Sequence, residues 1–260
     1  MINKYDKYYT NKKIVKTCCK IFKKYIKINK RDLIIEPSAG NGAFISCINK
    51  YNNLLFDIKP ENKKIKKLDF LKFNYDKIKN KYKSIHVIGN PPFGKKSSLA
   101  IKFIKKCSEF CDSISFILPK SFNKYFLKKS VPLNFHLIKS HNLPLNSFNI
   151  PIRCVFQIWK KKKYNRKKII KKILPNNNYK FVLKNENPDI AIRRVGSNSG
   201  NIYYNNLINK NINTHYFIKL LKYKKIKLKK LKLNKERENT LGTYSISKMD
   251  IIKKLNKYLI

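Results

Sequence analysis

A short apolar run beginning at Ile85 ends in Asn90-Pro91-Pro92-Phe93, and these residues could do chemistry on an amino group. The asparagine side chain provides an amide oxygen that accepts hydrogen bonds. The two prolines fix the backbone and donate no N–H, so nearby carbonyl groups remain available as acceptors. Two adjacent acceptors can hold an amino group, and an aromatic ring beside them can stack on the planar group that carries it.

A second segment has the composition of a ligand-binding turn. Residues 32–44 are predicted to form a buried strand ending at Glu36, a turn containing Gly40 and Gly42, and the start of a helix. Glycine allows the backbone to approach a ligand closely, and the free N–H groups of a helix start favour a negatively charged group. A lone Gly-x-Gly is weak evidence, but this one follows an acidic residue and precedes Asn90 by 48 residues.

Together the two segments resemble a known family. Glu36-Pro37-Ser38-Ala39-Gly40-Asn41-Gly42 resembles the cofactor loop of class I S-adenosylmethionine-dependent methyltransferases. Asn90 to Phe93 resembles the catalytic motif of the members that methylate exocyclic amino nitrogens, in the order found in gamma-group adenine N6-methyltransferases. The resemblance covers roughly residues 5–160 and implies S-adenosylmethionine as the cofactor. It implies the N6 amino group of adenine in nucleic acid as the acceptor, with DNA somewhat favoured over RNA.

The resemblance also assigns roles to single residues. Tyr8, Tyr9 and Thr10 resemble the segment that closes over the methionine part of the cofactor, and Asp69 with Phe70 resembles the pair at its adenine ring. Asp57 ends a predicted strand, where a carboxylate can accept the ribose hydroxyl groups. A plain loop cap is the alternative for Asp69. The expected cofactor residues are Tyr9, Thr10, Glu36, Pro37, Gly40, Gly42, Asp57, Asp69 and Phe70.

The expected chemistry requires few groups. The lone pair of adenine N6 is delocalised into the ring, so this nitrogen is a poor nucleophile until its geometry approaches tetrahedral. The Asn90 oxygen and the Pro91 carbonyl can each accept one N–H and stabilise the positive charge that develops during transfer. Alignment of the reacting atoms supplies much of the rest. Phe93 is expected to stack on the base, and Phe148 either covers its other face or anchors a loop on the core, with equal weight.

Composition indicates a nucleic-acid partner and an intracellular, soluble protein. The formal net charge is +47, from 61 Lys and Arg against 14 Asp and Glu, which favours a polyanion even though only six of the basic residues are Arg. No apolar segment of membrane-spanning length and no signal-peptide core is present, so no membrane partner is expected. The overall pattern resembles proteins of large AT-rich DNA viruses, which would place the chain in the cytoplasm or at a viral replication site. The six cysteines lack metal-site spacing and are expected to be buried thiols, with no disulfide and no metal.

Hydrophobic periodicity predicts an α/β fold with two domains. The first, residues 1–165, is expected to be a Rossmann-like class I methyltransferase sheet, mostly parallel with a terminal antiparallel hairpin and flanked by helices. His86 is expected to be a structural residue within this sheet. The predicted helices cover residues 12–28 and 97–112, and the predicted strands cover 32–36, 54–57, 84–89, 114–118, 135–139 and 152–159.

Residues 166–260 are predicted to form a small basic α+β region that recognises the substrate. An alternating segment there suggests a strand that presents Arg193 or Arg194 to a phosphate or a base edge, the alternative being a solvated strand face. Residues 222–233 could form a basic amphipathic strand or a basic amphipathic helix, and residues 247–260 are expected to form a capped terminal helix.

Several functions fit these patterns. An adenine N6-methyltransferase could act on DNA, by way of a flipped or unpaired base, or on RNA, where a cap-proximal adenosine or ribosomal RNA is the candidate. A protein glutamine N5-methyltransferase also uses Asn-Pro-Pro, although usually followed by Tyr instead of Phe93. The Asn-Pro-Pro-Phe motif also permits methylation of the N4 amino group of cytosine. A non-catalytic nucleic-acid-binding subunit would not need Gly40, Gly42, Asp57 and Asn90 together.

Overall fold

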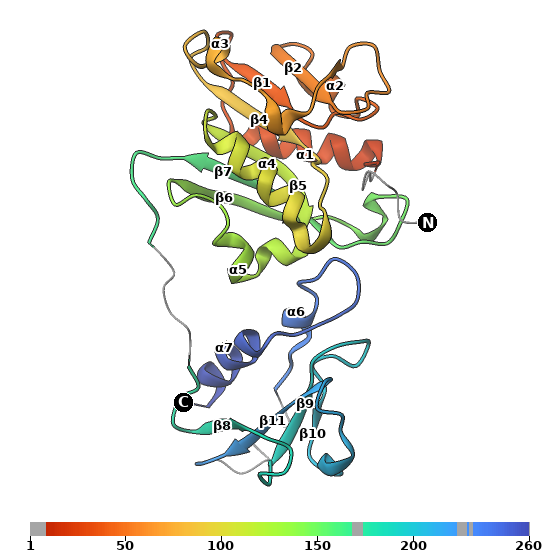
Figure 1. Ribbon diagram of the computed structural model, residues 1–260, viewed down its shortest axis with the longest axis vertical. Coiled ribbons are helices and arrows are strands. Elements are labelled where there is room, and N and C mark those ends of the chain that lie inside the picture. Colours follow the sequence, from red (N-terminus) through yellow and green to blue (C-terminus); the bar gives the residue numbers. More distant parts are fainter. Residues whose placement is uncertain (1–8, 168–173, 223–227, 229–230, 260) are drawn as a thin grey trace. The chain divides into compact units, whose positions relative to one another are not determined.

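The computed structural model describes residues 9–167, 174–222, 228 and 231–259. The chain divides into two compact units, Met1–Lys168 and Ile169–Ile260. The boundary predicted from the sequence lay between residues 165 and 166. Figure 1 shows the elements of each unit. We describe the two units separately.

The N-terminal unit is built on a seven-stranded sheet with the strand order β3-β2-β1-β4-β5-β7-β6. β7 pairs antiparallel with β5 and β6, and the other pairs are parallel. This strand order and the terminal antiparallel hairpin are those expected of a Rossmann-like class I methyltransferase sheet, so the predicted fold class is confirmed. The strands are β1 (Leu33–Glu36), β2 (Asn52–Asp57), β3 (Lys66–Lys67), β4 (Ile85–Gly89), β5 (Ser113–Pro119), β6 (Phe135–Asn142) and β7 (Cys154–Lys161).

Helices cover this sheet. Leu33, Ile35 and Val87 alternate with residues of the opposite face, and they form one core with the buried stripe of α4, which includes Phe103 and Ile104. Figure 1 shows α4 lying across the sheet beside β5. The helices of this unit are α1 (Lys12–Tyr25), α2 (Ile45–Ile48), α3 (Asp76–Lys79), α4 (Ser98–Ser108) and α5 (Tyr125–Lys128), with 3₁₀ turns η1 (Phe70–Lys72), η2 (Lys95–Ser97), η3 (Lys120–Asn123) and η4 (Leu145–Ser147).

The strand order places a crevice beside β1. After β1 the chain continues outward to β2 and then returns to β4 on the other side of β1. The connections therefore diverge at the carboxyl ends of β1 and β4, which is where open α/β sheets bind ligands. Glu36 ends β1 and Asn90 directly follows β4, so both lie at this edge.

The C-terminal unit contains a four-stranded antiparallel sheet with the order β10-β9-β11-β8. Its apolar face packs on α7, through Ile251, Leu255 and Leu259. A capping box between Ser247 and Asp250 begins α7, which confirms the predicted terminal helix. The predicted element at residues 222–233 lies largely outside the described residues. The elements are β8 (Tyr179–Val182), β9 (Ile190–Arg193), β10 (Ile202–Tyr203), β11 (His215–Leu220), η5 (Leu207–Asn209), α6 (Asn234–Arg237) and α7 (Lys248–Tyr258).

One prediction about the cysteines is wrong. Cys19 of α1 and Cys47 of α2 form a disulfide, with their Cα atoms 5.8 Å apart. The sequence could not show this pair, because the two helices are brought together only when they pack on the sheet. The other four cysteines, Cys18, Cys107, Cys111 and Cys154, are buried thiols as predicted.

Within the described residues, no helix combines the length and apolar character needed to cross a bilayer. In the same part of the chain, no cluster of three or more His, Cys, Asp or Glu side chains is arranged to hold a metal ion.

Candidate active site

A cavity of about 360 Å³ opens at the carboxyl ends of β1, β2 and β4. Segments that are far apart in the sequence meet on its wall: the N-terminal segment, the glycine loop, the turns after β2 and β3, and the motif after β4. The predicted site residues on the wall are Tyr9, Thr10, Glu36, Pro37, Gly40, Asp57, Asp69, Phe70, Asn90, Pro91 and Pro92. The volume lies in the range of about 300–1,000 Å³ typical of small-molecule sites.

The glycine loop is shaped by two positive φ angles. Gly40 has a φ of +53°, and its backbone N–H donates to Asp57 Oδ2 over 2.7 Å. Gly42 has a φ of +86°, and a Cβ there would overlap the Ile45 side chain. Both positions therefore favour glycine. Gly42 is not on the cavity wall and shapes the turn into α2, and its predicted contact with a cofactor stays a prediction.

The two aspartates on the wall also organise loops. Asp57 accepts the Gly40 N–H through Oδ2 and the Lys59 N–H through Oδ1 (2.8 Å), so it joins the turn after β2 to the glycine loop. Asp69 Oδ1 accepts the Leu71 N–H over 3.1 Å and caps η1, which is the cap considered as the alternative role. Both still line the cavity, and Phe70 beside them is buried in the core.

Glu36 is the most unusual polar group of the site. It is 2% exposed, and its Oε2 atom has no hydrogen-bond partner in the described part of the chain. Burial raises the pKa of this carboxyl well above its ordinary value of 4.5, and the nearby Asp57 charge raises this pKa further. A buried polar atom without a partner is costly and calls for an explanation. A ligand that donates a hydrogen bond at this position would remove the cost.

Asn90 is tied to two other segments. Its Nδ2 atom donates to Thr10 Oγ1 over 3.3 Å, and its backbone carbonyl accepts from Ser38 Oγ over 3.3 Å. Thr10 is in turn held by a β-bridge to Phe148. The structure thus brings the N-terminal segment, the glycine loop and the loop before β7 to the same asparagine.

Tyr9, on the cavity wall, is joined to the glycine loop through Glu61. Its hydroxyl group donates to Glu61 Oε1 over 2.7 Å, and the Glu61 N–H donates to the Gly40 carbonyl over 3.0 Å. These contacts link the N-terminal segment to the glycine loop. Tyr8 lies outside the described residues.

The two phenylalanines expected to hold a base are not on the wall of this cavity. Phe93 is 2% exposed and Phe148 is 7% exposed. The Phe93 carbonyl accepts the backbone N–H groups of Leu99 and Ala100, so Phe93 anchors the start of α4. Phe148 anchors Thr10, in agreement with the loop-anchor alternative. Stacking on a base would require both rings to move.

Arg193 and Arg194 belong to the C-terminal unit. The Arg193 guanidinium donates to the Val195 carbonyl (3.0 Å) and to Thr214 Oγ1 (3.1 Å), so it holds its own sheet together. Arg194 is exposed, with its guanidinium carbon 5.2 Å from the centroid of the Tyr216 ring.

The apolar part of the cavity wall was not predicted from the sequence. Ile58, Leu68, Leu71, Leu99 and Phe103 line the cavity. Three of them lie close to residues that were predicted, directly after Asp57 or around Asp69. Their proximity to a strand end was a usable signal, whereas Leu99 and Phe103 look like ordinary core positions of α4.

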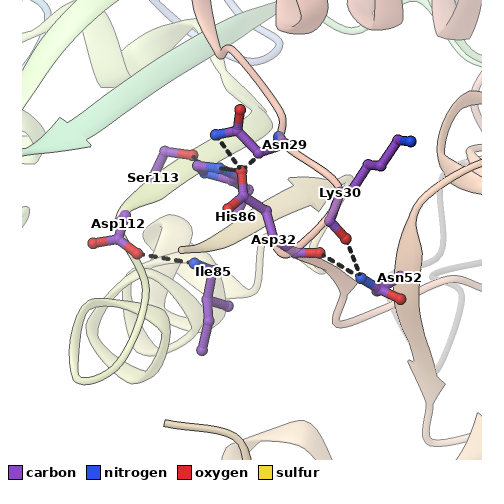
Figure 2. A network of polar contacts seen from close by, with 8 residues as sticks. All are labelled: Asn29, Lys30, Asp32, Asn52, Ile85, His86, Asp112 and Ser113. Carbon is purple, nitrogen blue, oxygen red and sulfur yellow. Dashed lines mark hydrogen bonds and ion pairs between the residues drawn. The ribbon is translucent and has the colours of Figure 1, made fainter. Parts of the chain in front are cut away.

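The same strands carry a second polar cluster at their other end (Figure 2). His86 Nδ1 lies 2.8 Å from Ser113 Oγ, and His86 Nε2 lies 3.6 Å from Asp32 Oδ2. All three residues are buried. Asp32 also accepts the Asn29 N–H over 2.7 Å, and Asp112 accepts the Ile85 N–H over 2.9 Å. His86 is therefore a structural residue away from the cavity, as its position in the predicted strand indicated.

Comparison with known proteins gives a limited result. No protein-family model matches the chain, and no curated protein matches its sequence. Among solved structures, the M protein of the type I restriction enzyme EcoKI is 13% identical, with 62% of this chain and 45% of that chain covered and a TM-score of 0.48. The 23S rRNA methyltransferase ErmE is 9% identical, with 62% and 72% covered and a TM-score of 0.46. An E. cuniculi complex responsible for methylation of the eRF1 translation termination factor contains a chain that is 10% identical, with 60% and 99% covered and a TM-score of 0.43.

Proposed function

We propose that this chain is an S-adenosylmethionine-dependent methyltransferase that acts on the N6 amino group of adenine in nucleic acid, with DNA somewhat favoured over RNA. The observation that carries the proposal is a single cavity whose wall holds both the glycine loop and the Asn90-Pro91-Pro92 motif. A cofactor on the loop would thus lie next to the group that holds the acceptor amine. This proximity supplies the alignment that transfer requires.

The residues of the cavity fit such a cofactor. The unpartnered Glu36 oxygen suits a donor on the ligand, and the turn at Gly40 lets the backbone come close to it. The wall around Phe70, Leu68 and Phe103 is apolar and suits a flat ring. When bound, the cofactor supplies an electrophilic methyl group on a sulfonium centre.

The chain itself holds and activates the acceptor. Thr10 holds the Asn90 amide through the hydrogen bond from Nδ2, and the amide oxygen accepts one amino N–H of the substrate. The Pro91 carbonyl accepts the second N–H. Both acceptors favour the tetrahedral nitrogen and the positive charge that develops on it, so they bind the transition state more strongly than the ground state. The apolar wall excludes water from the reacting atoms.

A labelling experiment tests the proposal. The purified chain is incubated with methyl-labelled S-adenosylmethionine and with separate DNA, RNA and protein pools, and the labelled pool is digested to identify the modified unit. N6-methyladenine in DNA or in RNA supports the proposal and identifies the polymer. Label in protein alone, as methylglutamine, would replace it with the glutamine N5 reaction. Measurable cofactor binding without label in any pool would instead favour a non-catalytic subunit.

A further inference from the structure

A second cavity, of about 530 Å³, lies within the C-terminal unit. Its wall joins the end of β8, the start of β11 and the η5 turn. Apolar side chains form most of this wall, namely Phe181, Leu183, Ile208, Ile212, Tyr216 and Phe217. The reaction proposed above uses none of these residues.

The rim of this cavity exposes apolar groups to solvent. Ile208 is 76% exposed, Leu183 is 67% exposed and Ile212 is 64% exposed. Apolar residues that are exposed together around a cavity often mark a binding site, whereas single exposed apolar residues are common on any protein surface. Phe181 and Tyr216 are also on the wall, and their rings meet edge to face with centroids 6.0 Å apart. The wall of the cavity thus combines exposed apolar side chains with a pair of aromatic rings.

Cationic side chains lie close to these two aromatic rings. Lys248 Nζ lies 4.3 Å from the centroid of the Phe181 ring, and Lys184 is also part of the wall. The Arg194 guanidinium carbon lies 5.2 Å from the centroid of the Tyr216 ring. Between residues 169 and 260 the sequence has 21 Lys and Arg but five Asp and Glu, so the unit as a whole attracts polyanions.

Aromatic and apolar surfaces flanked by cations are the chemistry that binds single-stranded nucleic acid, because bases stack on the rings while the cations neutralise the phosphates. We propose that this cavity binds an unpaired nucleobase, with Lys184 and Lys248 contacting the adjoining phosphates. A base inside a duplex has both faces stacked on neighbouring bases, so the cavity selects single strands. This inference deepens the proposed function, on which it rests for the identity of the substrate, by making the strand unpaired where it is recognised.

Fluorescence anisotropy with the full chain tests the apolar part of the proposal. The probes are labelled oligothymidine, oligouridine and a duplex of matched length, whose comparison separates DNA, RNA and paired strands. The Ile208→Ser, Ile212→Ser double variant is expected to bind both single strands about tenfold or more weakly than the unmodified chain, because it loses apolar surface that a bound base would cover; a tenfold change corresponds to about 1.4 kcal/mol. The matched control is Leu174→Ser, Leu221→Ser, which removes two other exposed apolar side chains of the same unit.

The role of the lysines in phosphate binding is tested with two lysines of the same helix. Lys248 and Lys257 are both exposed on α7, but Lys248 alone of the two is on the cavity wall. Lys248→Ala is expected to reduce the slope of log affinity against log salt by about 0.7 for a single strand. Lys257→Ala is expected to change this slope less.

Several results would overturn the proposal. One is unchanged single-strand binding by the Ile208→Ser, Ile212→Ser variant, and another is a preference of the unmodified chain for duplex. A dimer that this variant abolishes, with oligonucleotide binding intact, would make the cavity an interface between copies. If methyl label still enters nucleic acid in these cases, the proposed function stands and the cavity proposal fails. If label enters protein alone while the variant still loses oligonucleotide binding, the cavity proposal stands and the proposed function fails.

Discussion

The central strands of the N-terminal sheet carry buried polar groups at both of their ends, and the two ends differ in what these groups face. At the amino ends, Asp32, His86 and Ser113 lie close to one another in a buried cluster (Figure 2). Asp32 Oδ1 and His86 Nε2 have no hydrogen-bond partner in the described part of the chain, and none of the three residues lines the cavity. At the carboxyl ends, Glu36 is equally buried and its Oε2 atom also lacks such a partner, but Glu36 lies on the cavity wall. A ligand in the cavity can therefore supply a partner at the carboxyl ends and not at the amino ends.

The largest expected effect is on the rate of methyl transfer, at the carboxyl ends of the strands. Asn90→Ala removes an acceptor for the substrate amine, so we expect the transfer rate to fall by about 10³-fold or more, as for loss of a preorganised group that stabilises charge. Cofactor affinity, measured by calorimetry, is expected to stay within a few-fold of the original. The control is Asn49→Ala, an exposed asparagine that follows α2. Full activity of the Asn90→Ala variant would show that the catalytic assignment is wrong.

Substitution of Asp57 is expected to give the next largest effect, and this effect is on the affinity for the cofactor. Asp57→Asn weakens the acceptor for the Gly40 N–H and removes the charge expected to meet ribose hydroxyl groups. We therefore expect the dissociation constant of the cofactor to rise about 10- to 100-fold, which corresponds to about 1.4–2.8 kcal/mol. The control, Asp76→Asn, changes an exposed carboxylate on α3. Calorimetry that finds equal affinity in both variants would remove Asp57 from the cofactor site.

At the amino end the expected effect is on stability alone. Ser113→Ala deprives the buried His86 ring of its partner at 2.8 Å, and we expect the free energy of unfolding to fall by about 1–2 kcal/mol. The turnover number is expected to stay unchanged, because the cluster lies away from the cavity. Urea denaturation and initial rates measure the two quantities. Exposed Ser46 provides the control as Ser46→Ala. A variant that keeps its stability but loses turnover would contradict the division between the two ends.

The two ends also differ in how far the sequence predicted them. Apolar runs with Gly, Pro or Asp at their ends identified β1, β2 and β4 and placed Glu36, Asp57 and Asn90 at one edge, because parallel strands bring their carboxyl ends together. The pattern could not show that Phe93 turns into the core, since an aromatic residue after a strand suits both a site and a core. Most contacts with high sequence separation, such as Asn90 with Thr10, come from packing and have no local signal.

The C-terminal unit shows a different limit of the sequence. Its β8 and β11 strands have four and six residues, which are too few to show a clear alternation of apolar and polar positions in the sequence. The segment before Arg193 was found because alternating apolar residues precede a glycine-containing turn, yet its arginine bonds to its own sheet. Helix α7 was predicted correctly because a capping residue and a helical apolar stripe are both local features.

The smallest expected effect is a difference in the sign of the pH dependence at the two ends. Burial raises the pKa of Glu36 above 4.5, so the stability due to its protonated form is complete below pH 4.5 and is lost as pH rises through the raised pKa. Burial lowers the pKa of His86 below 6.5, although the Asp32 and Asp112 charges oppose this, so its contribution is complete above pH 6.5 and is lost as pH falls. In thermal melts across this range, Glu36→Gln is expected to raise the midpoint most at high pH, and His86→Gln is expected to flatten the decline at low pH. Saturation with S-adenosylmethionine should reduce the Glu36 effect and leave the His86 effect unchanged, because the ligand would reach the carboxyl ends of the strands alone. A cofactor that shifts both profiles equally would show that the two ends are coupled through the sheet.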